Sequence, residues 1–286
     1  MSERALYVGV DLGATNVRAG IVEEQNLLRV ESRRVDADGA VDVVMNQIFE
    51  VVDDVVGDDV VGIGVGVPSV VDVDTGVVYD VQNIPAMVDV PFKERFEDRY
   101  GRPTYVNNDV NCFVLGEYAF GKAQGYRNVA GMNLGTGFAA GLIVDGRLYE
   151  GSNCGAGEFG MIPYRESILE EYCSGLFFIN RGLDAAEMYH QAEAGDVVAR
   201  SLWEEFGHHV GNAVKSVMYG FDPELIVVGG SIRHAYAYFQ ESMWATVSDF
   251  GFRRTLERLE FELSELDDAP LLGAAELPRA AARRGA

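Results

Sequence analysis

The N-terminal third of the chain alternates short apolar runs with polar and turn-forming positions. Residues 5–11, 17–22 and 27–34 follow the two-residue period of half-buried β-strands. Residues 41–56 carry apolar positions at helical spacing, and residues 60–67 form a nearly continuous apolar run rich in glycine. Such a run is typical of a strand that is buried on both faces. The pattern therefore predicts three strands, a helix and a buried strand.

Strands and helices continue to alternate toward the C-terminus. Further helices are predicted over residues 92–100, 111–120, 185–218 with a break near Gly195, 232–247 and 271–284. Further strands are predicted over residues 104–106, 129–133, 139–144 and 225–228, with a hairpin turn at Asp145-Gly146. The chain is therefore expected to be α/β throughout.

The two halves of the chain share a short repeat. Residues 9–15 (GVDLGAT) overlay residues 131–137 (GMNLGTG), and Ile21-Val22 overlays Ile143-Val144. Each copy reads as a strand, a glycine turn and a returning strand. The repeat suggests a duplicated α/β fold, although two glycine hairpins can also resemble each other by chance.

The glycine turns of the repeat are candidate anion sites. In the first, Gly13 is expected to allow a positive φ and a close approach of the backbone, and Thr15 and Asn16 add donors. Asp11 can hold Mg²⁺, directly or through water. The second turn, Gly135-Thr136-Gly137, offers the same amides without an acid. Two such turns could hold a polyphosphate, but each can equally be only a turn.

The charge of the chain restricts its partners. Asp and Glu number 45 against 23 Lys and Arg, which gives a formal net charge of −22. A nucleic-acid surface and an anionic membrane both need clustered cations, so neither partner is expected. No apolar run approaches the roughly 18 residues of a transmembrane helix, and no signal peptide is visible. The odd number of cysteines, three, favours a reducing cytoplasm over a disulfide framework.

A series of motifs then recurs in a defined order. The motifs are residues 11–20 (DLGATNVRAG), 64–68 (GVGVP), 107–111 (NNDVN), 133–137 (NLGTG), 156–160 (AGEFG), 169–170 (LE), 227–231 (VVGGS) and 273–275 (GAA). In number, order and spacing this set resembles the ROK family of sugar kinases, in the actin/hexokinase-like ATPase superfamily. The resemblance covers nearly the whole chain, from about Val8 to Ala275.

The resemblance implies a fold and a domain division. The fold would be α/β, with duplicated ribonuclease-H-like (actin-like ATPase) domains flanking a cleft. Residues 1–110 would form a small domain and residues 111–270 a large one, and a C-terminal helix over about 271–286 would pack back on the small domain. A homodimer or homotetramer is also implied.

The resemblance also implies the roles of particular residues. ATP would be bound, with Mg²⁺, by Asp11, Gly13, Ala14, Thr15, Asn16, Gly135, Thr136, Gly137, Gly229 and Gly230. The sugar would be bound by Asn83, Asn108, Asp109, Glu158 and Glu170, with Asp109 as the catalytic base.

The chemistry of these residue types agrees with that assignment. Phosphoryl transfer needs a group that accepts the hydroxyl proton, and Asp109 follows a strand end where a side chain can reach a cleft. An Asn-Asp pair there can instead cap the next helix. Glu158 and Glu170 can be surface carboxylates, and Gly229-Gly230 can be a tight turn.

The chain departs from the family at its zinc site. Most members have a histidine after the Ala-Gly-Glu segment and then a cysteine-rich loop, whereas this chain has Met161 and a loop without cysteine. Zinc is therefore not expected, and the identity of the sugar is open. A zinc-less subset of the family acts on N-acetylmannosamine. The family's repressors carry an N-terminal helix-turn-helix, for which the few residues before Asp11 leave no room.

The sequence thus predicts an ATP-dependent hexose kinase that phosphorylates a sugar hydroxyl, at C6 of glucose or a related hexose. The alternatives are a kinase for N-acetylmannosamine, another amino sugar or fructose, a kinase that uses polyphosphate or another phosphoryl donor, and a sugar-binding regulator without catalysis.

The acidic surface predicts a dependence on salt. Because salt screens the mutual repulsion of like charges, we expect the melting temperature to rise as KCl is added, as in a protein adapted to a salty cell. The alternative is an acidic protein from a mesophilic source. Thermal unfolding over a KCl series measures this. A melting temperature that falls with added KCl would contradict the hypothesis of salt adaptation.

Overall fold

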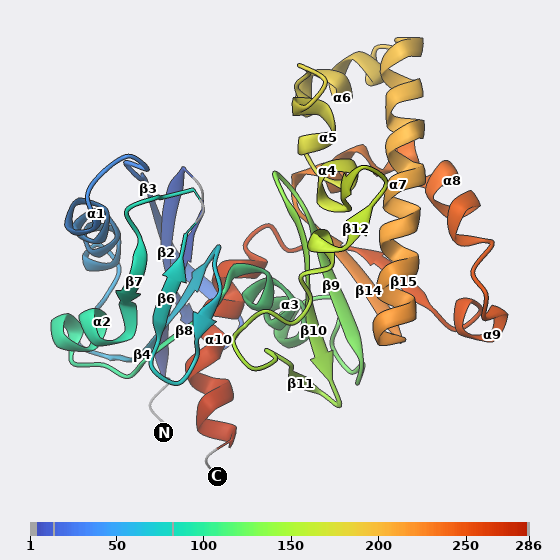
Figure 1. The fold of residues 1–286 in the computed structure, drawn as a ribbon. Coiled ribbons are helices and arrows are strands. Elements are labelled where there is room, and N and C mark those ends of the chain that lie inside the picture. The colour runs from blue at the N-terminus through green and yellow to red at the C-terminus, as the bar shows by residue number, and fades with distance from the viewer. Residues whose placement is uncertain (1–4, 14, 82, 285–286) are drawn as a thin grey trace. The chain divides into compact units, whose positions relative to one another are not determined.

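A computed structural model describes residues 5–13, 15–81 and 83–284 of the chain (Figure 1). The chain divides into two compact units. The first holds the N-terminal residues as far as Gly125, the segment Leu148–Ala156 and the residues from Glu265 onward. The second holds Tyr126–Arg147 and Gly157–Ser264. Residue 110, the domain boundary expected from the sequence, lies inside a helix of the first unit.

The first unit contains a five-stranded mixed sheet with the order β3-β2-β1-β4-β8. The strands are β1 (Leu6–Leu12), β2 (Asn16–Glu23), β3 (Asn26–Arg34), β4 (Val60–Val67) and β8 (Thr104–Asn108). Strand β1 is antiparallel to β2 and parallel to β4, and β4 is parallel to β8. The carboxyl ends of β1, β4 and β8 therefore meet at one edge of the sheet.

The second sheet repeats this arrangement with the order β11-β10-β9-β14-β15. Its strands are β9 (Val129–Leu134), β10 (Phe138–Val144), β11 (Arg147–Leu148), β14 (Leu225–Gly229) and β15 (Glu260–Leu263). Asp11 pairs with Gly66 in the first sheet as Asn133 pairs with Gly229 in the second. The shared order and register confirm the duplication, so the fold is α/β with two ribonuclease-H-like mixed sheets.

The long helices lie close to where the sequence predicts them. They are α1 (Val41–Asp53), α2 (Phe92–Tyr100), α3 (Asp109–Phe120), α6 (Ala185–Glu193), α7 (Val197–Phe221), α8 (Tyr236–Val247) and α10 (Ala269–Arg284). The predicted break separates α6 from α7, because Gly195 takes a φ of +93° and the Asp196 side chain caps α7. A 3₁₀ turn, η2 (Ser231–Ala235), replaces the predicted start of α8.

The sequence pattern did not reveal the shortest elements. These are β5 (Val71–Asp72), β6 (Val77–Asp80), β7 (Val88–Pro91), β12 (Pro163–Tyr164), β13 (Ser167–Ile168), β15, α4 (Glu170–Cys173), α5 (Leu176–Ile179), α9 (Arg253–Leu256) and the 3₁₀ turn η1 (Phe159–Met161). Two to four residues are too few to show a period, and pairing with neighbours creates these elements. Strands β5, β6 and β7 form an antiparallel sheet of their own.

Each unit has its own hydrophobic core. The first core lies between the sheet and helices α1 and α2, with Phe92 and Phe96 fully buried. The second is aromatic and centres on Trp203, Phe206 and Phe239 of helices α7 and α8. Among the residues that the structure describes, no helix is both long and apolar enough to cross a membrane.

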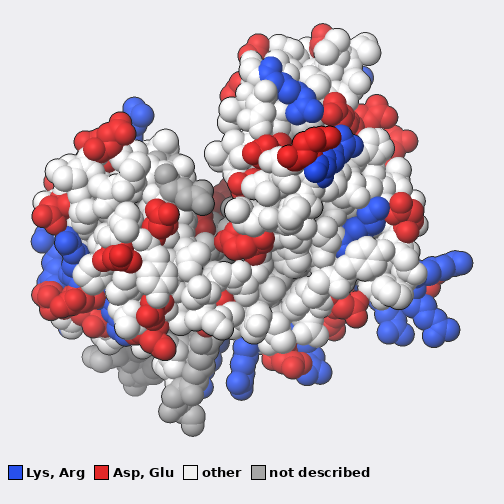
Figure 2. All heavy atoms as spheres, in the orientation of Figure 1, with Lys and Arg blue, Asp and Glu red and all other residues white. Residues whose placement is uncertain are grey.

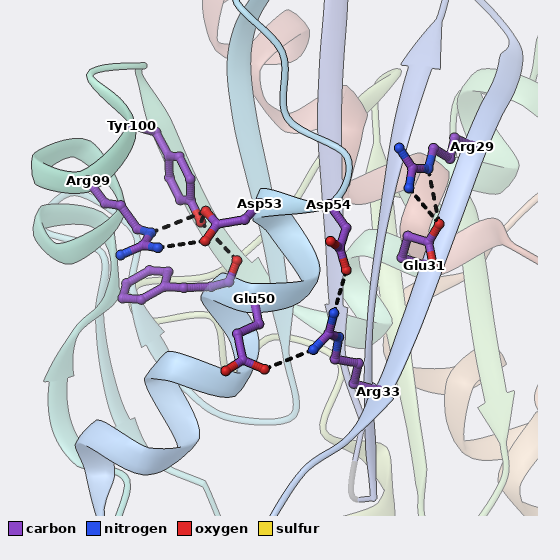
Figure 3. Close-up of polar contacts among 9 residues, drawn as sticks. Arg29, Glu31, Arg33, Glu50, Asp53, Asp54, Arg99 and Tyr100 are labelled. Carbon is purple, nitrogen blue, oxygen red and sulfur yellow. Dashed lines mark hydrogen bonds and ion pairs between the residues drawn. The ribbon is translucent and has the colours of Figure 1, made fainter.

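On the face shown in Figure 2, acidic side chains spread over both units, with Lys and Arg singly or in small groups among them. On the first unit, Arg33 pairs with Glu50 and Asp54 at 2.9 and 2.6 Å, and Arg99 pairs with Asp53 at 2.6 Å (Figure 3). Exposed pairs of this kind contribute at most about 1 kcal/mol each and weaken in salt. These ion pairs therefore do little to compensate for the repulsion among the excess negative charges.

Helix α10 packs against the first sheet with direct contact between backbones. A Cβ added to Gly64 of β4 would lie 1.8 Å from the carbonyl oxygen of Ala274 in α10. A Cβ on Gly273 of α10 would lie 1.7 Å from the carbonyl oxygen of Cys112 in α3. Only glycine permits these approaches, so the C-terminal helix is a fixed part of the first unit.

We expect Gly64→Ala to destabilise the protein by about 1–3 kcal/mol or more, because the methyl group would push α10 off the sheet. Gly155→Ala is the matched control, since its Cβ would meet its nearest neighbour, Asn153 Oδ1, only at 3.4 Å. Chemical denaturation of both variants measures the change. Equal stability of the two variants would show that the close packing of α10 contributes nothing.

Candidate functional site

Two predicted site residues, Asp11 and Asp109, lie at the carboxyl edge of the first sheet. Asp11 at the end of β1 pairs with Gly66 of β4, and Gly66 pairs with Asn107 of β8. Asp109 follows β8 directly and begins helix α3. A Cβ on Gly66 would lie 3.6 Å from the Cα atom of Asp109. The backbone of Asp109 therefore packs against the strand beside Asp11, and the closest neighbour of such a Cβ would be Cys112 Sγ at 3.2 Å.

Asn108 caps the helix that Asp109 begins. Its Oδ1 atom accepts hydrogen bonds from the backbone N–H groups of Val110 and Asn111, at 2.9 and 3.2 Å. Its Nδ2 atom donates to the carbonyl oxygen of Ser69 at 3.3 Å. The capping interpretation of the Asn-Asp pair is therefore correct for Asn108. The Asp109 carboxylate accepts a hydrogen bond from the N–H of Val110 at 2.9 Å.

Asp11 lies in a desolvated position. Burial raises its pKa from 3.8 to about 6, the Arg18 guanidinium lowers it, and Asp268 raises it. Arg18 stands opposite Asp11 in the β1–β2 register and forms an ion pair with Asp268 of the C-terminal segment. Asp11 lies next to the first glycine turn, whose donors suit phosphate oxygens. Because a bound cation would offset the cost of ionising this carboxylate, Asp11 is a suitable oxygen ligand for Mg²⁺.

The first glycine turn is closed by its own backbone. The N–H of Gly13 donates to the carbonyl oxygen of Asn16 at 2.8 Å, and Asn16 Nδ2 donates to Thr15 Oγ1 at 3.2 Å. Gly13 does not take the expected positive φ; a Cβ there would lie 3.2 Å from the Asn16 oxygen, so close approach explains the glycine. Ala14 lies outside the described residues.

The second glycine turn is held from outside by residues that follow the β12–β13 hairpin. The N–H of Gly135 donates to Gly137 at 3.1 Å, and the N–H of Gly175 donates to Gly135 at 2.8 Å. The Glu170 carboxylate accepts the N–H of Phe138 at 2.7 Å, and a Cβ on Gly137 would lie 2.5 Å from its Oε2 atom. A predicted sugar ligand therefore touches a predicted phosphate turn.

Glu158 lies near that carboxylate. Burial and the nearby charge of Glu170 both raise the pKa of Glu158 above its usual range. Gly157 before it takes a φ of +94° and packs against the carbonyl oxygen of Ala140, which fixes where the Glu158 side chain starts. Two carboxylates close together favour ligands that donate several hydrogen bonds.

The remaining predicted residues have simpler surroundings. Asn83 lies in an exposed turn, and none of its described contacts joins it to the other site residues. Gly229 ends β14 beside Asn133, and Gly230 takes a φ of +81°. A Cβ on Gly230 would lie 2.1 Å from the carbonyl oxygen of Leu134. The tight turn after β14 therefore explains why residue 230 is glycine.

Comparison with known proteins decides the family. The ROK family model matches residues 7–281, which is nearly the whole chain. The chain belongs to the ROK family. The resemblance to ROK sugar kinases drawn from the motifs is thereby confirmed.

Individual ROK relatives are similar along most of their length. The glucokinase of Thermotoga maritima is 27% identical, with 94% of this chain and 96% of the relative covered. The N-acetyl-D-glucosamine kinase of Photobacterium profundum is 29% identical, with 82% and 87% covered. A ROK family glucokinase from Streptomyces griseus, solved with glucose and AMPPNP, superposes with a TM-score of 0.81 at 26% identity, with 96% and 99% covered.

The region expected to lack the zinc of other ROK proteins is packed by side chains. Met161 is exposed, and the buried Cys173 donates from its thiol to the carbonyl oxygen of Leu169. Tyr164 of β12 bonds His209 of α7 at 3.1 Å and packs edge-on against Tyr172. Within the described ranges no group of three or more His, Cys, Asp or Glu residues could hold a metal ion. That zinc is absent stays a prediction.

Sequence reasoning missed several residues that support this ROK site. Asp268 pairs with Arg18, Gly175 supports Gly135, and Glu150 bonds Asn107. Their partners lie 40 or more residues away along the chain, 43 in the case of Glu150 and Asn107. No local pattern could have signalled them.

Replacing Asp11 should reveal the cost of its desolvation. Its folded-state pKa is raised, so its ionisation destabilises the protein as pH rises from about 4 through 6. We expect Asp11→Asn to raise stability by about 1–3 kcal/mol at pH 8 without Mg²⁺, and to leave it nearly unchanged at pH 4. Thermal unfolding at both pH values measures the difference. A variant that is less stable at pH 8 would contradict the assigned desolvation.

Proposed function

We propose that this ROK protein is an ATP-dependent hexose kinase that phosphorylates the C6 hydroxyl of glucose or a related hexose. The observation that carries the proposal is the placement of Asp109. Its carboxylate stands at the first turn of a helix and at the same strand edge as Asp11. The glucokinase relatives and the ATP analogue bound by one of them support the choice of reaction.

Asp109 would act on the attacking hydroxyl. A carboxylate at a helix N-terminus is stabilised in its charged form, so at neutral pH it accepts a hydrogen bond and orients the hydroxyl oxygen. As that oxygen bonds to the γ-phosphorus, its proton passes to Asp109 and ADP leaves with the bridging oxygen. The rate then depends on how accurately the Asp109 carboxylate is oriented toward the attacking hydroxyl, since positioning supplies most of the catalysis in this reaction.

The glycine turns and Asp11 would receive the nucleotide. The N–H groups of Gly13 and Gly135 donate within their turns, so the other backbone N–H groups of the turns, with the hydroxyls of Thr15 and Thr136, would be the donors for phosphate oxygens. Asp11 would hold Mg²⁺, which when bound neutralises charge on the phosphate oxygens. Gly229 and Gly230 would border the adenosine.

The sugar would be held by Asn83, Asn108, Asp109, Glu158 and Glu170. Burial and the nearby charge of Glu170 both raise the pKa of Glu158, so its carboxylate is costly to ionise. Vicinal sugar hydroxyls that donate to both carboxylates would relieve that repulsion. Asn108 Nδ2 carries a second N–H besides the one given to Ser69.

An amino-sugar kinase is the second candidate. The relative from Photobacterium profundum is an N-acetyl-D-glucosamine kinase at a similar level of identity. A panel of glucose, fructose, galactose, mannose and their N-acetyl amines, with ATP or polyphosphate as donor at low and high KCl, separates these substrates. A homodimer or homotetramer in the cytoplasm is proposed on the family resemblance alone.

We expect Asp109→Asn to bind sugar but to lose turnover by about two to four orders of magnitude, because the amide cannot accept the proton. Coupled ADP release measures kcat, and calorimetry measures sugar binding. Asp98→Asn, on the exposed face of α2, makes the same chemical change away from the site. Near-normal turnover in Asp109→Asn would refute its role as the base. Sugar binding without ADP release in the unaltered protein would point to a regulator.

A further inference from the structure

The chain returns briefly to the first unit between two stretches of the second. The segment Leu148–Ala156, here called the crossover segment, belongs to the first unit, while Arg147 before it and Gly157 after it belong to the second. Glu158 follows two residues after the crossover segment ends. A very short stretch of chain therefore links the contacts of the crossover segment in the first unit to Glu158, a predicted sugar ligand.

The crossover segment binds the residue that stands two positions before Asp109. Asn107 Nδ2 donates to Glu150 Oε1 at 2.9 Å, and Cys154 Sγ donates to Asn107 Oδ1 at 3.2 Å. Burial raises the pKa of the Cys154 thiol to about 11, so the sulfur keeps its proton and remains a donor at neutral pH. Both ends of the Asn107 amide are thus held by the crossover segment.

The same amide also organises the first turn of helix α3. Asn107 Oδ1 accepts from the backbone N–H of Asn108 at 2.9 Å and from Asn111 Nδ2 at 2.9 Å. Asn107 and Asn111 are both buried, at 2% and 1% exposure. The Asn107 amide thus contacts Asn108 before Asp109 and Asn111 after it. The orientation of this amide therefore affects the path of the backbone that carries Asp109.

Cys154, the thiol donor to Asn107, has a backbone conformation that favours glycine. Its φ is +59°, in the left-handed region that residues with a Cβ rarely adopt. Glycine would fit there without strain but would have no thiol to give to Asn107. The side chain is retained where the backbone disfavours it, and its described hydrogen bond is to Asn107.

We propose that Asn107 is a positioning residue for Asp109, and that Glu150 of the crossover segment sets its orientation. The inference rests on the proposed kinase function. Within the first unit, the Asn107 amide transmits the placement of the crossover segment to the orientation of the Asp109 carboxylate. Asn107 itself touches no reacting atom in this scheme. Its effect should appear in kcat more than in the KM for ATP.

Exchanging the donor and the acceptor tests the hydrogen bond between Asn107 and Glu150. In N107D, Oδ1 can still accept from Asn108, Asn111 and Cys154, but Oδ2 faces the Glu150 carboxylate and is repelled. We expect kcat to fall about 10- to 100-fold, as for a catalytic group displaced by roughly 1 Å, with the KM for ATP within about threefold. In N107D/E150Q the new side-chain amide donates to the new carboxylate, so the bond forms in the reverse direction. The kcat of this double variant should return to within about threefold of the unaltered protein.

Two further variants serve as references for this swap. E150Q alone keeps a carbonyl acceptor for Asn107, so it should lose less activity than N107D. Asn26→Asp adds the same charge at the exposed start of β3 in the first unit and controls for charge alone. If N107D does not fold, Glu150→Ala decides: a fall in kcat of about fivefold or more supports the proposal, and kcat within about twofold overturns it.

The outcomes separate this proposal from the proposed function. The melting temperatures of the unaltered protein, N107D, E150Q and N107D/E150Q form a second double-mutant cycle, which does not depend on turnover. Rescue of kcat and melting temperature by E150Q in the N107D background supports the coupling. Unaltered kcat in N107D, or no rescue in either measurement, overturns it. An unaltered protein that turns over no sugar contradicts the kinase function instead, and the melting cycle still tests the contact.

Discussion

Direct backbone contact between helix α10, helix α3 and the first sheet determines where Asp109 can lie. The contacts pass through Gly64 and Gly273, where even one methyl group would meet a carbonyl oxygen at less than 2 Å. Helix α3 therefore has no freedom to shift across the sheet. Because Asp109 is its first residue, the C-terminal helix, more than 150 residues away in sequence, helps to place the candidate base.

The electrostatics of the site pose a problem that the backbone solves. The protein carries a formal charge of −22 and would bind an anion, and burial together with nearby carboxylates already raises the pKa of Asp11 and Glu158. In the proposed function the glycine turns would offer N–H donors, which attract phosphate without adding a cation. The cations are used elsewhere, in exposed ion pairs such as those of Arg33 and Arg99 (Figure 3). The proposed phosphate contacts would therefore be made by backbone donors rather than by the cations of the surface.

Local signals predicted the fold well where geometry is set by neighbouring residues. Asp145-Gly146 takes positive φ at both positions, as the predicted hairpin turn requires, and Gly195-Asp196 divides the long helical region as expected. The repeat at Gly9 and Gly131 predicted two sheets of one topology. The sheet β5-β6-β7 escaped prediction, because its strands of two to four residues depend on partners for their form.

The site was predictable at the level of motifs and less so at the level of contacts. Residue types and spacing located Asp11, Asp109 and both turns. They left open whether the Asn-Asp pair caps the next helix, which Asn108 does, and they did not show that Glu170 accepts a hydrogen bond from the N–H of Phe138. The Asn107–Glu150 bond joins residues 43 positions apart, and only the folded chain brings them together.

Transfer of the γ-phosphoryl group to a sugar is followed most directly by phosphorus NMR of ATP, Mg²⁺, glucose and the purified protein. If Asp109 and the glycine turns form a hexose kinase site, a sugar 6-phosphate ester and ADP appear in equal amounts. Related hexoses and their N-acetyl amines would then rank the substrates by rate. The kinase function would be contradicted if ATP remained intact with every sugar, or if ADP and inorganic phosphate formed without a sugar ester.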